Sequence, residues 1–226
     1  MSLMQQTWSN VVFIHQEVDA NSLKKLIPSS LELDLYNGKA YISFVAFLMK
    51  DIKPFGLSAM PYFDSMQEFN LRTYVKYKNH SAVYFFSLDA TKSLLIEIAR
   101  KFFMLNYLKA SINYDLKEKI ECIRSDNRDH LVKFTADFEI KNEIEKDELS
   151  NWLTERYSYL ESKKQIVYQG KLEHPKWQLK KVQLKSIKEN YLTAYGIKPI
   201  NNEYLCHYSS EIKVEIKSFK AISSKL

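Results

Sequence analysis

The sequence contains few of the residues that build disulfide frameworks, metal sites or flexible linkers. Its two cysteines, Cys122 and Cys206, lie far apart and have no partner at the spacing of a zinc site, so we expect free thiols. The five histidines show no metal-ligand spacing either, and no metal site is expected. With 4 glycines and 5 prolines in 226 residues, no linker divides the chain. We therefore expect a single domain over residues 1–226.

Long apolar runs and secretion signals are also missing. No stretch approaches the roughly 18 consecutive apolar residues that span a bilayer, and the N-terminal residues lack a charged region followed by an apolar one. These absences predict a cytoplasmic protein without a membrane partner. The motifs of serine hydrolases, P-loop proteins and dinucleotide-binding proteins are absent as well, so no cofactor is expected.

Arginine is scarce although the chain is basic. The net charge is +6, yet five of the 33 basic residues are arginine, and the lysines are scattered among acidic residues. The densest lysine run covers residues 163–188, which we interpret as a solvated face, with an anion-binding patch as the alternative. No specific nucleic-acid partner is expected. Because arginines are few, each one calls for its own explanation.

Hydrophobic patterning predicts a fold dominated by β-strands. Strands are expected over residues 10–15, 31–36, 40–49, 66–77, 82–88, 107–122, 130–140, 165–174 and 204–219. Segment 40–49 is apolar on both alternating faces and is expected at the centre of the fold. Adjacent strands with few helices between them predict the α+β class, with a mostly antiparallel, barrel-like sheet and a few peripheral helices.

Turn residues predict the connections between several of these strands. Asn37-Gly38 is typical of a type I′ turn and predicts a hairpin between 31–36 and 40–49. Segments 66–77 and 82–88 are expected to form another hairpin. Segment 107–122 is expected to pair with 130–140 through a turn near Asp126-Asn127, and a loop is expected at 54–61.

Short helices are expected between the strands. The first follows Asp19 or Asn21 as its cap, and the last ends at Gly196. A helix capped by Asp89 is predicted from apolar residues at i, i+3, i+4 and i+7, namely Leu95, Ile98, Ala99 and Phe102. The same spacing predicts another helix from Leu149, Trp152, Leu153 and Arg156.

The strand at 66–77 carries the most informative polar pattern. Glu68, Asn70 and Arg72 alternate along one face at about 6.6 Å spacing, so neighbouring members can share one small ligand. If Phe69 and Leu71 on the opposite face pack against helices, the polar face points into a barrel interior. The alternative is an outward face with an exposed ion pair worth under about 1 kcal/mol.

Two further arginines are candidates for binding an anion. Arg156 is predicted on the apolar stripe of its helix, where a buried guanidinium needs a carboxylate partner or an anionic ligand. A structural salt bridge and an anion site are both open. Arg100 lies off the stripe of its own helix, and on pattern alone it is expected to be exposed.

Several ordered motifs resemble the YqjF-like family of uncharacterised bacterial proteins over nearly the whole chain. They are Glu68-Phe69-Asn70-Leu71-Arg72-Thr73-Tyr74-Val75, Val83-Tyr84-Phe85-Phe86-Ser87-Leu88-Asp89-Ala90, Ala99-Arg100, Leu153-Thr154-Glu155-Arg156-Tyr157, Trp8 with Phe13-Ile14-His15, His174-Pro175-Lys176-Trp177 and His207-Tyr208-Ser209. That family resembles the acetoacetate decarboxylase-like group. The resemblance implies a mostly antiparallel barrel with a polar pocket inside, and it favours an inward orientation of Glu68 and Arg72.

The same resemblance places Tyr107 at the position of a catalytic lysine. Enzymes of that group form a Schiff base between this lysine and a β-keto acid. Lys109 lies two residues further along the expected strand, on the same face but about 6.6 Å away, and its use as a substitute stays open.

Two hypotheses for function follow from these residues. In the first, an anionic carboxylate or carbonyl compound binds to Asn70, Arg72, Arg100 or Arg156, Glu68 acts as acid or base, and Tyr107 donates to a developing oxyanion. In the second, the same pocket is a non-catalytic binding or sensing module. A homo-oligomer is left open by the sequence.

Overall fold

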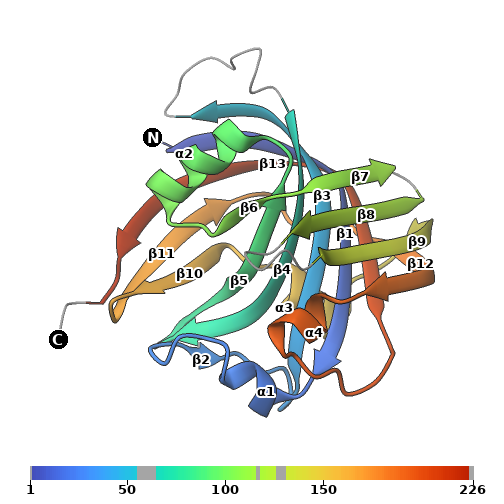
Figure 1. Cartoon of the computed structure of the whole chain (residues 1–226), viewed down its shortest axis with the longest axis horizontal. Coiled ribbons are helices and arrows are strands. Elements are labelled where there is room, and N and C mark those ends of the chain that lie inside the picture. The colour runs from blue at the N-terminus through green and yellow to red at the C-terminus, as the bar shows by residue number, and fades with distance from the viewer. Residues whose placement is uncertain (1, 55–64, 116–117, 126–130, 224–226) are drawn as a thin grey trace.

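The computed structural model describes residues 2–54, 65–115, 118–125 and 131–223. Its strands are β1 (Met4–Val18), β2 (Glu32–Leu33), β3 (Ala40–Pro54), β4 (Ser65–Tyr77), β5 (His80–Ala90), β6 (Tyr107–Lys109), β7 (Ser111–Asp115), β8 (Lys119–Ser125), β9 (Leu131–Glu143), β10 (Ser158–Lys163), β11 (Ile166–Glu173), β12 (Lys180–Glu189) and β13 (Leu205–Ala221). Its helices are α1 (Ala20–Lys24), α2 (Ser93–Phe103), α3 (Glu148–Thr154) and α4 (Tyr191–Tyr195). Figure 1 shows the helices at the periphery of a large curved sheet.

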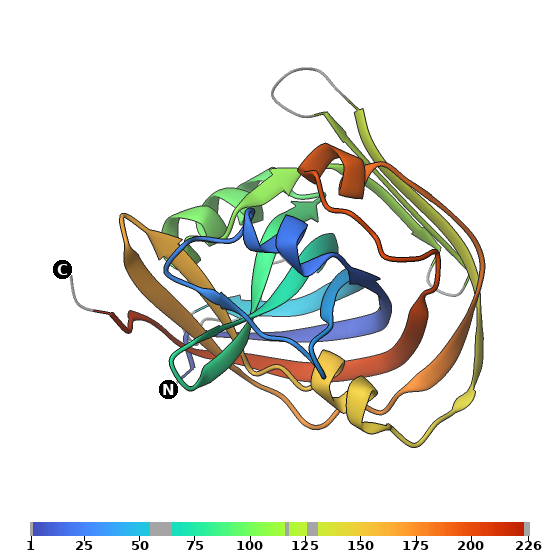
Figure 2. The same cartoon turned by 90° about the horizontal axis from the view of Figure 1, so that it is seen from below.

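Pairing between β1 and β13 closes this sheet on itself. A first ring follows β1, β3, β4, β5, β10, β11 and β13. A second ring shares β13, β1, β3, β4 and β5 with the first and is completed by the consecutive strands β6 and β7, then β8, β9 and β12. Figure 2 shows the sheet wrapping around these interiors. The expected α+β fold, with a mostly antiparallel, barrel-like sheet and peripheral helices, is confirmed. The sheet is mixed, since β5 pairs in parallel with both β6 and β10.

The central shared strands, β3 and β4, are buried on both faces along most of their length. One face of β4 places Phe69, Leu71 and Val75 in a core that fills the second ring, together with residues of β7, β8 and β9. The opposite face places Tyr74 in a separate core inside the first ring. Phe69 also packs against helix α4, since its ring centre lies 5.3 Å from that of Tyr191. Phe69 and Leu71 face the second ring, which the strand pattern did not reveal.

The region around Asn37-Gly38 forms the predicted turn but not the predicted hairpin. Asn37 and Gly38 have φ angles of 49° and 81°, and Tyr36 and Lys39 exchange two backbone hydrogen bonds of 3.0 and 2.9 Å. However, β2 pairs with β4, not with β3. Strand β3 already pairs with β1 along one edge and with β4 along the other. Strand β2, which precedes the turn, pairs instead with the part of β4 that continues beyond the end of β3.

Other local predictions are confirmed in part. Strands β4 and β5 form the expected hairpin, and β8 pairs with β9, although 107–122 divides into β6, β7 and part of β8. The loop at 55–61 and the turn at Asp126-Asn127 lie outside the described residues. Strands β10 and β12 were not predicted, because β10 is only 6 residues long and β12 carries few apolar residues among its lysines.

The helix predictions differ from the structure at their ends. The Asp19 carboxylate caps α1 by accepting from the Ser22 backbone N–H at 2.8 Å, as expected. In contrast, Asp89 lies in β5, and α2 begins later, after Lys92. Helix α3 ends at Thr154, so Arg156 lies beyond it. Asp89 therefore lies within the sheet, and Arg156 lies next to it. A charged side chain in either place needs a partner.

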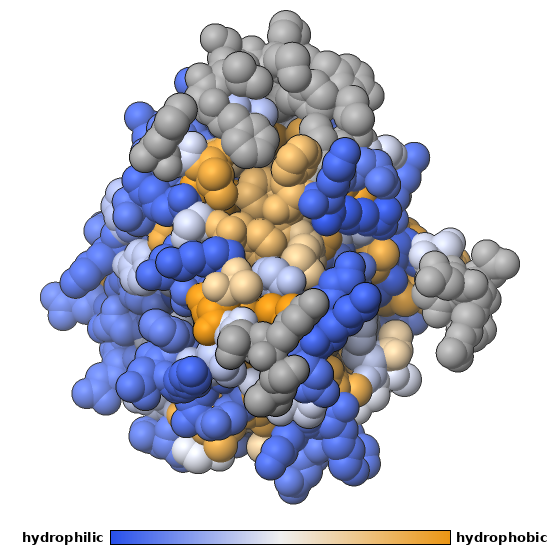
Figure 3. All heavy atoms as spheres, turned by 90° about the vertical axis from the view of Figure 1, so that its left-hand side faces the viewer, coloured by the Kyte–Doolittle hydropathy of each residue, from blue (hydrophilic) through white to orange (hydrophobic). Residues whose placement is uncertain are grey.

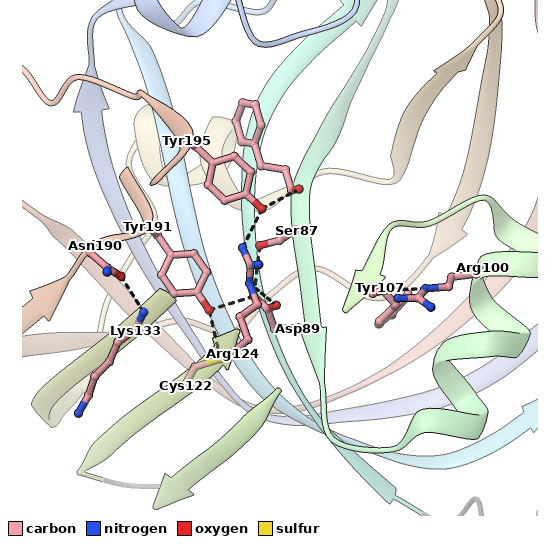
Figure 4. Close-up of polar contacts among 11 residues, drawn as sticks. Ser87, Asp89, Arg100, Tyr107, Cys122, Arg124, Lys133, Asn190, Tyr191 and Tyr195 are labelled. Atoms are coloured by element: carbon pink, nitrogen blue, oxygen red, sulfur yellow. Dashed lines mark hydrogen bonds and ion pairs between the residues drawn. The ribbon is translucent and has the colours of Figure 1, made fainter. Parts of the chain in front are cut away.

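Asp89 is fully buried and lies in the second ring (Figure 4). Its carboxylate is 2.9 Å from Arg124 Nε and accepts hydrogen bonds from Tyr191 and Ser87 at 3.0 and 3.2 Å. Arg124 also donates to the Tyr195 hydroxyl at 2.9 Å. Burial raises the pKa of Asp89 to about 6, while Arg124 opposes that rise. The pair ties β5 to β8 and α4.

Removal of the cation tests this buried pair. Arg124→Met is expected to lower the free energy of unfolding by about 3–5 kcal/mol at neutral pH, because the Asp89 carboxylate is then left buried and unpaired. The loss should shrink as the pH falls toward about 6, because without Arg124 to oppose the effect of burial the pKa of Asp89 is higher in the variant, and its carboxyl group becomes neutral at a higher pH. Urea unfolding at several pH values measures both effects.

The matched control removes a cation from the surface. Lys185 pairs with Glu139 at 3.6 Å, and its side chain is 56% exposed. Lys185→Met is expected to change stability by under about 1 kcal/mol. Equal losses for the two variants, or a loss for Arg124→Met that does not depend on pH, would contradict the assignment.

Candidate functional site

A cavity of about 70 Å³ lies inside the first ring. Its walls come from β1, β3, β4 and β5 on one side and from β6, β10, β11, β13 and the segments that follow α3 and β11 on the other. Most of the lining is apolar or aromatic. The polar lining residues are Gln6, Glu68, Asn70, Arg72, Tyr107, Thr154, Arg156 and His174. The structure thus brings together five of the six residues that the sequence singled out.

Glu68 occupies the centre of a hydrogen-bonded group with Asn70 and Tyr107. The Tyr107 hydroxyl donates to Glu68 Oε2 at 2.6 Å, and Asn70 Nδ2 donates to Oε1 at 3.0 Å. Glu68 is 3% exposed, and this burial raises its pKa to about 7, although both hydrogen bonds act in the opposite direction. Burial and the nearby Glu68 raise the pKa of Tyr107 well above its ordinary value. Near neutral pH, Glu68 can therefore either accept or donate a proton.

Parallel pairing between β5 and β6 places Tyr107 beside Glu68. Tyr107 pairs with Leu88, while Glu68 pairs with Ala90 on the other edge of β5. Arg100 Nε donates to the Tyr107 carbonyl oxygen at 2.7 Å, which fixes β6 against α2 (Figure 4). Arg100 also pairs with Glu97 at 2.9 Å, and its side chain is 42% exposed. The structure therefore leaves Arg100 outside the cavity, where it supports the strand that carries Tyr107.

Arg72 is a buried cation without a carboxylate partner among the described residues. Its side chain lines the cavity, and its Cζ atom lies 5.5 Å from the centre of the Phe13 ring. Neither Nε nor Nη2 has a hydrogen-bond partner in the described part of the chain. Burial lowers the pKa of Arg72. Such a guanidinium costs free energy unless an anion or a polar ligand pairs with it.

Arg156 forms the structural salt bridge that its sequence position allowed, and it also lines the cavity. Its Nη1 atom lies 2.6 Å from Asp34 Oδ2, and its Nε atom donates to the Trp152 carbonyl oxygen at 2.8 Å. Its Cζ atom is 4.4 Å from the Trp152 ring centre and 5.0 Å from that of Tyr74. Nη2 has no partner among the described residues, and the side chain lines the cavity. The salt bridge orients Arg156 and leaves one nitrogen for a ligand.

Unpartnered polar atoms are concentrated in the residues that line this cavity. Five are donors and two are acceptors: Trp8 Nε1, Arg72 Nε, Arg72 Nη2, Arg156 Nη2 and Trp177 Nε1, and then Gln6 Oε1 and Asn70 Oδ1. Buried polar atoms are normally hydrogen-bonded, so this concentration calls for a ligand or ordered water. The excess of donors favours a ligand rich in acceptor oxygens.

Sequence reasoning missed Gln6, Trp8, Trp177 and His174 as lining residues. Gln6 and Trp8 alternate on β1, which is a readable signal, but the inward face then changes to Val11 and Phe13. An irregularity in the β1–β3 pairing between Ser9 and Val12 accounts for the change. His174 is the last residue of the strand expected at 165–174, and Trp177 follows it. The sequence pattern there did not indicate which side chains face inward.

The described residues that line the cavity include no lysine. Tyr107 lies in the cavity wall, whereas Lys109 is exposed at the end of β6. No group of three or more metal-binding side chains occurs among the described residues. Within the same residues, no helix has the length and apolar character needed to cross a membrane.

Solved structures with the same fold include acetoacetate decarboxylase-like proteins. An acetoacetate decarboxylase-like enzyme from Sphingomonas wittichii RW1 matches with a TM-score of 0.67 and 10% identity, covering 100% of this chain and 95% of that one. Acetoacetate decarboxylase from Legionella pneumophila matches with a TM-score of 0.65 and 13% identity, covering 99% and 90%. The enduracididine biosynthesis enzyme MppR complexed with pyruvate matches with a TM-score of 0.65 and 9% identity, and the match covers 97% of this chain and 90% of that one. At these identities the likeness shows the fold alone.

Sequence comparison identifies nearer relatives. The chain is 35% identical over 213 residues to the uncharacterised protein YqjF of Bacillus subtilis (strain 168). The match covers 92% of this chain and 88% of that protein. A family profile matches residues 5–213. The expected resemblance is therefore confirmed, and the chain belongs to the DUF2071 family of uncharacterised conserved proteins.

Proposed function

We propose that the cavity binds a small organic acid that carries a carbonyl group, and that Glu68 transfers a proton to or from it. The observation that carries this proposal is the pair of buried guanidiniums, Arg72 and Arg156, whose free nitrogens belong to the same cavity as Glu68. A carboxylate is the anion that matches a guanidinium in both charge and geometry.

The chemistry follows from the positions of the side chains. The ligand's carboxylate accepts hydrogen bonds from Arg72 and Arg156. The Glu68 carboxylate removes a proton from the carbon next to the ligand's carbonyl group. The electron pair of that C–H bond forms a carbon–carbon double bond, and the π electrons of the carbonyl group move to its oxygen. The resulting oxyanion accepts a hydrogen bond from the Tyr107 hydroxyl, which turns from Glu68 once Glu68 is protonated. Return of the proton completes an exchange in which nothing is oxidised or reduced.

The site does not favour a lysine Schiff base. Tyr107 stands where the resemblance places the reactive lysine, and its side chain is a phenol. The structure of MppR that contains pyruvate shows only that a protein of this fold binds such a compound. Borohydride reduction in the presence of pyruvate is expected to leave this chain unmodified, and a reduced adduct on Lys109 detected by mass spectrometry would refute the mechanism proposed here.

A non-catalytic binding module is the second candidate. Both Glu68 oxygens already accept hydrogen bonds, at 2.6 and 3.0 Å, as in a fixed cavity wall. In that case the arginines bind the acid and Glu68 sets the shape of the site. Proton exchange on a bound ligand distinguishes the two candidates.

Arg72→Met is expected to weaken pyruvate binding by at least about tenfold, because a charged hydrogen bond contributes about 1.5–3 kcal/mol. Lys76→Met on the same strand is the control, since Lys76 forms an exposed pair with Glu32 at 3.7 Å and does not line the cavity. Titration calorimetry measures both affinities. Equal binding by Arg72→Met and the unsubstituted protein would show that the anion site is elsewhere.

Glu68 is expected to catalyse exchange of the pyruvate methyl hydrogens with deuterium from the solvent. The rate should rise with pH through about 7, because the pKa of Glu68 is raised to about 7 and the carboxylate form is the base. Glu68→Gln should abolish the exchange. Proton NMR follows the loss of the methyl signal, and binding without any exchange would support the non-catalytic module.

Tyr107→Phe is expected to move the midpoint of this pH profile upward. The hydrogen bond from Tyr107 lowers the pKa of Glu68 against the larger effect of burial, so its removal raises that pKa further. Tyr208→Phe is the matched control, because the Tyr208 hydroxyl donates to Asn10 Oδ1 at 2.7 Å and the residue does not line the cavity. A shift of the same size in both variants would contradict a specific role for Tyr107.

A further inference from the structure

A second cavity adjoins the first and has a different chemical character. Its volume is about 50 Å³, and it lies between the first ring and α2. The residues that line it and not the first cavity are all apolar: Met4, Ile52, Met66, Leu95, Ala99 and Phe103. We call this space the apolar chamber. Figure 3 shows the side of the molecule that is on the left in Figure 1, where apolar side chains gather between hydrophilic ones.

The two cavities share part of their walls. Gln6, Met49, Leu105, Tyr107 and Ile216 line both of them. A ligand whose carboxylate lies between the arginines can therefore pass Tyr107 and extend into the apolar chamber. On this basis we propose that the natural ligand is a monocarboxylate with a short, unbranched apolar chain, a proposal that rests on the anion site described above.

Methionine provides much of the wall of the apolar chamber. Met4, Met49 and Met66 are three of the 6 methionines in the chain. An unbranched thioether side chain adapts its shape to fill irregular gaps and to contact varied apolar groups. Such a wall suits a flexible chain better than it suits a rigid or charged group.

Gln6 marks the boundary between the polar cavity and the apolar chamber. Its side chain is buried, and its Oε1 atom has no hydrogen-bond partner among the described residues. The amide oxygen accepts hydrogen bonds, so a water molecule or a donor group of a ligand, and not an apolar chain, can supply the missing contact. Gln6 therefore lies where the polar lining of the first cavity gives way to the apolar lining of the second.

The volumes limit the length of the ligand. About 70 and about 50 Å³ each correspond to about four to six water-sized spheres. The two spaces together fit a carboxylate with a few methylene groups. They are far too small for a nucleotide or a coenzyme A ester.

A series of straight-chain acids tests the proposal. Acetate, butanoate, hexanoate and octanoate are titrated separately into the full chain by calorimetry. Affinity should rise by about fourfold for each added methylene until the apolar chamber is full, since burial of a methylene contributes about 0.8 kcal/mol. Affinity that stays constant along the series would refute the role of the apolar chamber while leaving the anion site intact.

The methionine methyl groups report where the chain lies. In NMR spectra of protein labelled at these methyls, hexanoate and octanoate should shift the signals of Met4 and Met66, and acetate should not. Unmoved signals with bound octanoate would overturn the proposal. If none of the acids binds, and Arg72→Met behaves like the unsubstituted protein, the anion site itself fails.

Filling the apolar chamber provides an independent test. Ala99 lines it from α2, so Ala99→Leu should reduce the affinity for octanoate to nearly that for acetate, while the affinity for acetate is unchanged. Ala194→Leu makes the same change at an exposed position of α4, away from both cavities, and should leave the series unchanged. An equal response of the two variants would refute the assignment of the apolar chamber.

Discussion

Burial of β4 on both faces is the constraint on which the site depends. The strand lies between β3 and β5 and separates two interiors, so none of its central side chains reaches bulk solvent. A carboxyl group and a guanidinium in this position lose their hydration. Glu68 therefore has a pKa near 7, and Arg72 keeps nitrogens that lack partners. On an exposed strand the same residues would form an ordinary surface ion pair of little energetic weight.

The first ring uses its polar groups differently from the second. In the second ring, the opposite charges of Asp89 and Arg124 form an ion pair at 2.9 Å, and two tyrosines and a serine donate to or accept from the pair. In the first ring, Glu68 is satisfied by Tyr107 and Asn70, and Arg72 receives no carboxylate from the described residues. A buried group that is fully paired stabilises one arrangement of the chain, whereas an unpaired one can bind something else. This difference separates a structural cluster from a candidate binding site within one sheet.

The sequence predicted the positions of the strands more reliably than it predicted what each strand face packs against. Alternation along 66–77 identified the face that carries Glu68 and Arg72, because the period of two follows directly from strand geometry. It could not reveal that Phe69 and Leu71 face a second interior, since this depends on pairings between strands that are far apart in the chain. Arg100 is exposed, as its place off the apolar stripe of its helix predicted. The surroundings of Arg156 were open for a related reason, because α3 ends before this residue and helix ends are poorly determined by periodicity.

The two interiors are close enough to influence each other electrostatically. Phe69 pairs with Asp89 across β4 and β5, and Glu68 is the next residue, so the two carboxyl groups lie on neighbouring positions but face opposite rings. The charge of Asp89 contributes to the raised pKa of Glu68, after the larger effect of burial. Arg124 compensates part of this charge. The structural ion pair of the second ring thus helps to set the proton affinity of the carboxyl group in the first, which links the stability of the fold to the chemistry that its cavity can support.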